Sequence, residues 1–190
     1  MTEGGAVTTT SVPLDDATLV GRARDGDVHA YEQLVRRYQG PMFRLALKML
    51  HHRGDAEDVV QEAFLGAWRK LGQLNDDNAF VGWLYRGTTN RCLNVIRARR
   101  PQADVDLDLA ESPRRDTQPE HAAQVSGQLA ALDEALQTLT PQQRACWLLR
   151  EVHGRSYDEI SEIVGANPTA VRGRIARARA QLAEVMKPWR

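Results

Sequence analysis

Hydrophobic residues recur at steps of three and four positions along most of this 190-residue chain, with polar residues between them. This is the spacing of one face of an α-helix. It is clearest in residues 30–50, at Tyr31, Leu34, Val35, Tyr38, Met42, Leu45 and Met49. The alternation of apolar and polar residues that marks a half-buried strand is missing, so the pattern predicts an all-α protein.

Helix start signals divide the first part of this pattern into four predicted helices. Acidic residues suited to accept a backbone N–H at a helix N-terminus stand at Asp15 or Asp16, at Asp27 and at Asp55. The fourth helix is predicted over residues 79–99. Together the four helices predict a domain of residues 14–100.

Residues 101–127 interrupt the pattern. They hold three prolines, and six acidic residues against two arginines, which favours a flexible acidic linker. Residues 1–13 are rich in Gly, Thr and Ser and predict a disordered tail. The helical periodicity resumes after the linker, so the sequence predicts a second small helical domain over residues 128–187.

The second domain contains a predicted helix-turn-helix at residues 154–179. Ser156 and Glu159 form a capping box at its start, and Gly165 suits the left-handed conformation that ends a helix. Asn167 is placed to cap the next helix, with Pro168 at its first position. Because that second helix is rich in arginine, we expect it to enter a DNA major groove.

Charge is distributed unevenly, although 25 basic residues balance 25 acidic ones. Residues 86–100 contain five arginines and no acid, and residues 168–190 contain six basic residues and one acid. Two local basic surfaces of this kind predict two salt-sensitive contacts with one polyanion.

The first basic surface lies on the fourth predicted helix. Arginine neutralises phosphates and asparagine reads base edges, and both recur there at three- and four-residue steps: Arg86, Asn90, Arg91, Asn94 and Arg97. In the polar stretch before this helix, Asn75 and Asn78 could hydrogen-bond a base taken out of the stack. The spacing of Trp83 favours a place in the core over base stacking, and Tyr85 is left open.

The third predicted helix carries an apolar stripe and, opposite it, an acidic face. Phe64 and Trp68 belong to the stripe and are expected to point inward. The acidic face is formed by Asp55, Asp58 and Glu62 at helical spacing, with Gln61 beside them. The preference of a helix N-terminus for acids would account for the first acid but less well for the whole face.

Three segments resemble bacterial RNA polymerase sigma factors. Residues 55–71 (DAEDVVQEAFLGAWRKL) resemble the most diagnostic sigma segment, and residues 80–100 (FVGWLYRGTTNRCLNVIRARR) resemble the promoter-melting helix. Residues 139–145 (LTPQQRA) and the helix-turn-helix resemble sigma region 4. The size and the two-domain plan are similar to those of the extracytoplasmic function (ECF, group 4) subfamily.

The resemblance implies a role for each surface. Core RNA polymerase, through the β′ clamp coiled coil and the β subunit, would be the main partner, and the β′ contact would use Asp55, Asp58, Gln61 and Glu62. The minus-ten promoter element would meet Asn75, Asn78, Arg86, Asn90, Arg91, Asn94 and Arg97. The minus-thirty-five element would meet Asn167, Thr169, Arg172, Arg174 and Arg177. An anti-sigma factor is an expected further partner, and the linker would thread towards the RNA exit path.

One departure from the family pattern concerns the second helix of the helix-turn-helix. A Gly-Thr-Val-Lys-Ser-Arg run is common there, whereas this chain has TAVRGR at residues 169–174. Gly173 replaces a hydroxyl residue at a cost of about 0.5–1 kcal/mol in helix propensity. The departure puts the base preference in doubt while leaving the docking on DNA intact.

Other classes of protein fit the sequence less well. Neither a phosphate-binding loop nor a nucleophile motif occurs, so we expect no enzyme and no cofactor. His51 and His52 near the acidic helix lack the Glu-x-x-His pairing of bundle metal sites. With no leader or membrane-spanning run, a cytoplasmic protein is expected. The remaining alternative is a conventional dimeric helix-turn-helix regulator whose N-terminal bundle is a sensor.

Overall fold

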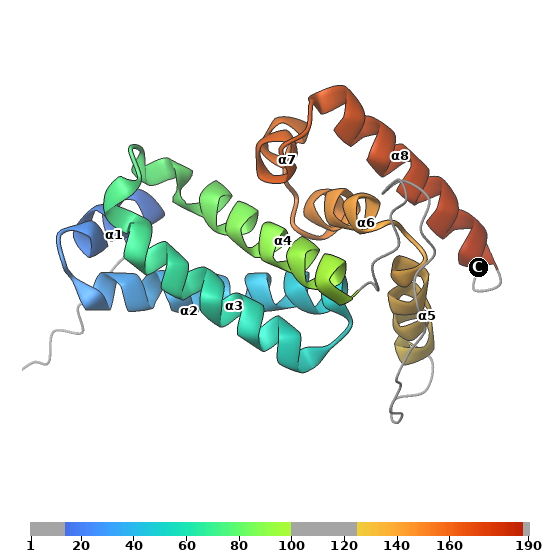
Figure 1. Cartoon of the computed structure of the whole chain (residues 1–190), viewed down its shortest axis with the longest axis horizontal. Coiled ribbons are helices and arrows are strands. Elements are labelled where there is room, and N and C mark those ends of the chain that lie inside the picture. Colours follow the sequence, from blue (N-terminus) through green and yellow to red (C-terminus); the bar gives the residue numbers. More distant parts are fainter. Residues whose placement is uncertain (1–13, 100–124, 188–190) are drawn as a thin grey trace, which may run out of the picture.

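The computed structural model describes residues 14–99 and 125–187, which form two adjoining helical bundles without a strand in either range (Figure 1). The N-terminal bundle contains α1 (Asp16–Arg24), α2 (Val28–Leu50), α3 (Arg53–Lys70), the 3₁₀ turns η1 (Leu71–Gln73) and η2 (Asp77–Ala79), and α4 (Phe80–Arg99). The C-terminal bundle contains α5 (Val125–Gln137), α6 (Pro141–Trp147), the π-helical turn η3 (Leu148–Val152), α7 (Tyr157–Val164) and α8 (Pro168–Val185). The predicted all-α class is confirmed.

Side-chain caps begin the first three helices. Asp15 accepts the backbone N–H of Thr18 at 2.7 Å, and Asp27 accepts that of Ala30 at 3.1 Å. The third helix begins earlier than predicted, because the ring of His52, and not an acid, accepts the N–H of Asp55 at 3.2 Å. Asp55 therefore lies inside the first turn of α3.

The apolar stripes of α2, α3 and α4 meet in one core. Leu34, Met42 and Leu45 of α2 are fully buried, and so is Phe80 at the start of α4. Burying a side chain of this size contributes roughly 1.5–3 kcal/mol, so the helical spacing in the sequence translates directly into the packing of the bundle.

The helix-turn-helix forms as the sequence predicts. The Ser156 hydroxyl accepts the N–H of Glu159 at 3.1 Å, and the Glu159 carboxylate accepts the N–H of Ser156 at 2.7 Å. Gly165 ends α7 in the left-handed region at φ 64°, where a residue with a Cβ is strained. Asn167 then caps α8 by accepting the N–H of Ala170 at 2.8 Å.

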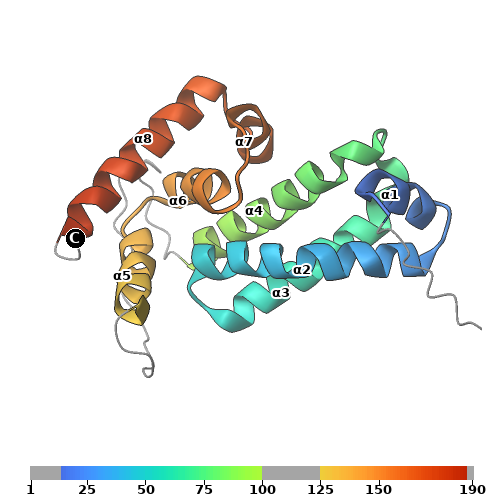
Figure 2. The same cartoon turned by 180° about the vertical axis from the view of Figure 1, so that it is seen from behind.

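The two bundles pack against each other in this structure. Helix α7 lies against α4, while α6 and η3 contact α2 (Figures 1 and 2). Helix α5 begins at Val125, three residues before the predicted domain start. The predicted disordered tail (1–13) and all but the end of the predicted linker (101–127) lie outside the described residues, so both stay predictions.

Candidate polymerase-binding and DNA-binding surfaces

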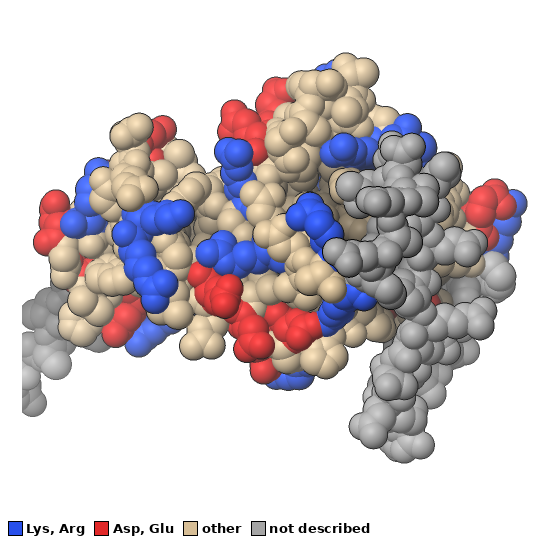
Figure 3. All heavy atoms as spheres, in the orientation of Figure 1, with Lys and Arg blue, Asp and Glu red and all other residues tan. Residues whose placement is uncertain are grey.

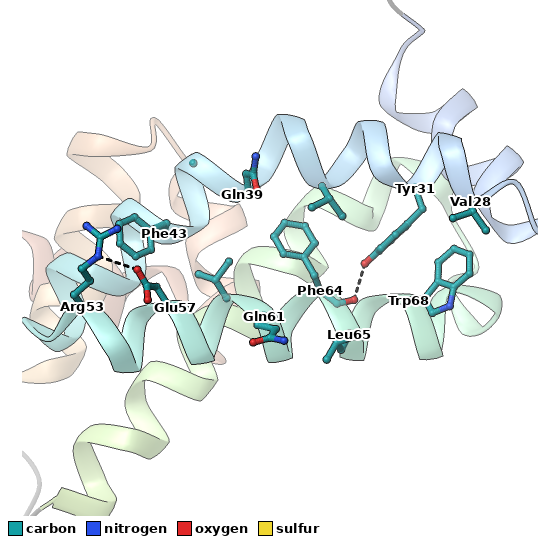
Figure 4. A pocket seen from close by; sticks show the side chains of 13 residues that line it. Val28, Tyr31, Gln39, Phe43, Arg53, Glu57, Gln61, Phe64, Leu65 and Trp68 are labelled. Atoms are coloured by element: carbon teal, nitrogen blue, oxygen red, sulfur yellow. Dashed lines mark hydrogen bonds and ion pairs between the residues drawn. The ribbon is translucent and has the colours of Figure 1, made fainter.

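An apolar groove of about 790 Å³ opens between α2 and α3. Its walls are formed mainly by hydrophobic side chains: Val28, Tyr31, Val35, Phe43, Val60, Phe64, Leu65 and Trp68. Figure 4 shows Tyr31 and Phe64 between the two helices. The Tyr31 hydroxyl donates to the carbonyl oxygen of Phe64 at 2.6 Å and ties the two walls together.

The expectation that Trp68 points fully inward is wrong. Its side chain is 37 % exposed and lies against Tyr31, with the ring centroids 4.8 Å apart. Leu65, one turn earlier, is 46 % exposed on the outer side of α3. The residue spacing correctly predicted that Trp68 lies on the side of α3 that faces α2. Helix α2 covers only part of the indole, because Trp68 lines the open groove.

The acidic face of α3 is only partly free. Asp58, Gln61 and Glu62 are exposed, and Figure 3 shows acidic side chains gathered along α3. Asp55, in contrast, is half-buried and forms an ion pair with Arg99 of α4. The structure thus leaves three of the four predicted residues accessible and pairs the fourth with Arg99 of α4.

A second, smaller pocket of about 190 Å³ lies between α3 and α4. It brings together three of the predicted residues, Arg86, Asn90 and Arg91, with Lys70 and Trp83. Lys70 was missed because it stands on the preceding helix, outside the arginine-rich segment, and only the packing of α3 on α4 brings it near. Trp83 is half-buried: it packs on the core, as expected, and also lines this pocket.

Arg91 is half-buried and lines the pocket between α3 and α4. Its guanidinium donates to the carbonyl oxygen of Gly87 at 3.1 Å and stands 3.9 Å from the Glu62 carboxylate. A Cβ at Gly66 would come within 2.7 Å of the same guanidinium, so a small residue there leaves room for it.

The remaining predicted minus-ten residues lie outside the pocket. Asn78 is exposed in the turn before α4, where its side chain donates to the Asp76 carboxylate at 3.0 Å, and Asn75 is exposed nearby. Asn94 and Arg97 are exposed further along α4 and hydrogen-bond each other at 3.0 Å. The structure therefore arranges the set as a row along α4 with the pocket near its start.

The arginines of α8 differ in their surroundings. Arg172 and Arg177 are exposed, as is Thr169 in the first turn. Arg174 is half-buried and interacts with the thiol of Cys146 in α6. Asn167 uses its side-chain oxygen as the helix cap, which occupies the acceptor that the sequence offered for base contact. The accessible cations of this helix are thus fewer than the sequence suggests.

Comparison with known proteins identifies the family of the chain. The family models of sigma-70 region 2 and of sigma-70 region 4 match residues 34–102 and 129–182. The RNA polymerase sigma-H factor of Pseudomonas aeruginosa is 36 % identical over 182 residues, which cover 91 % of this chain and 94 % of that protein. The chain belongs to the ECF group of the sigma-70 family.

Further relatives of this sigma factor support the same membership. The ECF RNA polymerase sigma-E factor of Escherichia coli K12 is 35 % identical over 187 residues, covering 94 % of this chain and 97 % of that protein. The structure of CnrH in complex with the cytosolic domain of CnrY superposes with a TM-score of 0.71 at 28 % identity, covering 91 % of this chain and 97 % of that one. RpoE of Bartonella quintana shares the fold at a TM-score of 0.64 and 21 % identity, covering 83 % and 96 %.

Metal binding, membrane insertion and cysteine reactivity were considered for the described ranges of this sigma factor. No group of three His, Cys, Asp or Glu side chains there could hold a metal ion. Among the helices of residues 14–99 and 125–187, none is long and apolar enough to cross a bilayer. Cys92 and Cys146 are buried, and burial raises the pKa of both thiols, that of Cys92 to about 12, so both stay in the unreactive thiol form.

Proposed function

We propose that this sigma factor binds core RNA polymerase through the outer face of α3 and places its two basic surfaces on the two elements of a promoter. The observation that carries the assignment is the face formed by Asp58, Gln61 and Glu62, which lies exposed beside an apolar groove on the same helix. A regulator that only bound DNA would have no use for such a face.

The polymerase contact follows from the chemistry of α3. Exposed carboxylates suit a basic partner, and an apolar wall beside them supplies the desolvated centre that a stable interface needs. Gln61 belongs to both parts, because it lines the groove and also points out from α3 (Figure 4). We infer that the β′ clamp coiled coil covers this face, with Leu65 and Trp68 at its margin.

The minus-ten contact is assigned to α4 and the pocket at its start. Cationic groups of Lys70, Arg86 and Arg91 suit phosphates, and the amide of Asn90 suits a base edge. Trp83 offers an aromatic surface beside them. Asn75 and Asn78 would approach the strand from the turn before α4, and Asn94 and Arg97 would follow it along the helix.

The minus-thirty-five contact is assigned to the first turns of α8. Thr169 and Arg172 are exposed there, and Arg177 follows. A Cβ at Gly173 would meet only the Arg177 guanidinium, at 3.5 Å, so the glycine is not required by packing and leaves the backbone accessible to DNA. Asn167 stabilises this helix as its N-cap, and Arg174 stabilises it by its contact with Cys146 of α6.

Regulation by an anti-sigma factor and a place in the cytoplasm complete the proposal. The related fold of RpoE was solved with the anti-sigma factor NepR, and CnrH with the cytosolic domain of CnrY. A protein that covers the groove and the face of α3 would exclude polymerase. Sigma factors are non-catalytic initiation factors, so this chain is not expected to be an enzyme, and it would act where polymerase and chromosome meet.

The test is transcription in vitro with purified protein, sigma-free core polymerase and genomic fragments of the source bacterium. The wild-type chain should give discrete start sites. Asp58→Ala combined with Gln61→Ala should lower both core binding and transcript yield at least about tenfold, the size expected when a central interface cluster is lost.

A matched control removes one exposed acid and one exposed amide elsewhere. Asp25→Ala combined with Gln33→Ala makes the same change in charge away from the groove, the face of α3 and both proposed DNA-binding surfaces, and should leave yield unchanged. If the chain gave no transcripts and no core binding but bound a palindromic duplex as a dimer, the conventional regulator would be the better assignment.

A further inference from the structure

Tyr157 is the meeting point of three arginines in the C-terminal bundle. It is the first residue of α7, which packs against α8 in the helix-turn-helix (Figure 1). The Arg150 guanidinium lies over its ring, 4.8 Å from the ring centroid, and the Arg172 guanidinium lies over the same ring at 5.5 Å. The Arg179 guanidinium interacts with its hydroxyl. One aromatic side chain thus gathers three cations that would otherwise repel one another.

The Tyr157 ring is held in place by its surroundings. The capping box of Ser156 and Glu159 fixes the backbone on either side of it, and the ring packs against the core of the bundle. At the hydroxyl end, Arg179 is itself tied to Glu151 by contacts of 3.1 and 2.5 Å. The ring is therefore a fixed platform for the cations that lie over it.

Of the three arginines, Arg172 depends most on this platform. Arg150 also donates to the carbonyl oxygen of Arg155 at 2.8 Å, and Arg179 has its ion pair with Glu151. Arg172 is exposed and, within residues 14–99 and 125–187, has neither an ion pair nor a hydrogen bond. The ring of Tyr157 is thus the interaction that restrains its guanidinium.

A restrained arginine binds a phosphate better than a mobile one. A free arginine side chain samples many rotamers, and fixing one of them on binding lowers the affinity. A guanidinium over an aromatic face is held by the electrons of the ring and not through its N–H groups. Those groups stay available, and their planar fork matches two oxygens of one phosphate.

We propose that Tyr157 is a positioning residue for the minus-thirty-five contact, whose ring holds the Arg172 guanidinium ready for a phosphate of the DNA backbone. The inference rests on the proposed function, because it takes α8 as the DNA-binding helix. It adds a residue of the preceding helix, outside the arginine-rich segment, that acts through Arg172.

The first test measures the mobility of arginine side chains in the free, full-length chain by relaxation of their Nε nuclei in NMR. Arg172 should be more ordered than Arg177, which is also exposed on α8. Tyr157→Leu should bring Arg172 to the mobility of Arg177, whereas Tyr157→Phe keeps the ring and should leave Arg172 ordered. A wild-type Arg172 as mobile as Arg177 would overturn the proposal, and this outcome needs no variant to fold.

The second test is a double-mutant cycle on binding of the holoenzyme to a promoter duplex from which the wild-type chain starts transcription. Tyr157→Leu should weaken binding about three- to tenfold, the range expected for fixing one long side chain. In an Arg172→Ala background the same change should cost less than about twofold, because no guanidinium is left to position. Tyr157→Phe should bind within about twofold of the wild type.

Val164→Ala is the matched control, because it removes a half-buried apolar side chain at the other end of α7. Its effect should be the same in both backgrounds. If Tyr157→Leu also had the same effect in both backgrounds, or none, Tyr157 would only stabilise the fold and the positioning role would be overturned. An Arg172→Ala variant that binds normally would overturn the assignment of Arg172 to DNA. The mobility measurement needs no polymerase, so it distinguishes that failure from a failure of the stack.

Discussion

Arginines that look equivalent in the sequence of α8 have different surroundings in the fold. Arg172 is exposed on the outer side, Arg174 is half-buried against α6, and Arg179 is tied to Glu151 by two contacts of 3.1 and 2.5 Å. The sequence could predict a basic helix but could not rank its members, because that depends on which side α6 and η3 cover.

Arg172, whose guanidinium lies over the Tyr157 ring at 5.5 Å, and Arg179, which forms an ion pair with Glu151, offer a direct comparison of two cations on this helix. Arg172→Ala should weaken binding of the holoenzyme to a minus-thirty-five duplex and reduce the slope of log affinity against log salt by about 1, since one phosphate contact is lost. Arg179→Ala, an equal change in charge, should leave the slope nearly unchanged because its guanidinium already pairs with Glu151. Equal effects of both variants would contradict the assignment of Arg172. The measurement is a salt titration of binding.

At the scale of elements, the local signals were the most reliable part of the prediction. The capping box of α7, the left-handed Gly165 and the Asn167 cap all occur as expected, because each depends on a few neighbouring residues. The start of α3 was predicted wrongly because its cap is a residue type that was not considered. An acid was expected as its cap, whereas the ring of His52, three residues before Asp55, supplies the acceptor.

The capping box predicts a measurable contribution to stability. Ser156→Ala removes the acceptor of the Glu159 N–H and should lower the free energy of unfolding by about 1 kcal/mol in a urea titration. Ser161→Ala in the middle of the same helix is the control. Its hydroxyl donates to the Tyr157 carbonyl, a bond that competes with the helix, so its loss should change stability by less than about 0.5 kcal/mol. An equal loss from both variants would argue against the cap.

At the scale of the whole molecule, the closed arrangement, in which the two bundles pack together, should respond to acid. Burial, together with the charges of the nearby Arg44 of α2 and Arg155 before α7, lowers the pKa of His153 to about 4, while Tyr85 faces the ring from α4. In an open chain the pKa would return to its usual 6.5. The open state therefore binds the proton more readily, and closure is fully favoured above pH 6.5 and weakens as pH falls towards 4.

Between pH 7.5 and 5.5 the ratio of open to closed chains should rise by up to about tenfold, as a pKa near 4 in one state and 6.5 in the other requires. Small-angle X-ray scattering at the two pH values measures it. His153→Gln should remove the response, whereas His29→Gln on the exposed surface of α2 should keep it. A wild-type chain with the same dimensions at both pH values would show that His153 does not report on closure.

The sequence by itself determined the helices, all of their predicted caps except that of α3, the two-bundle plan and the family, because these depend on periodicity and on neighbours a few residues apart. Only the tertiary structure decided which predicted residues are accessible: Asp55 is taken by Arg99, and Lys70 joins the pocket from another helix. It alone also decided how the bundles meet. Arg144 donates to the carbonyl oxygen of Met49, which lies 95 residues away along the chain, and no local pattern records a contact between a side chain and a distant backbone oxygen.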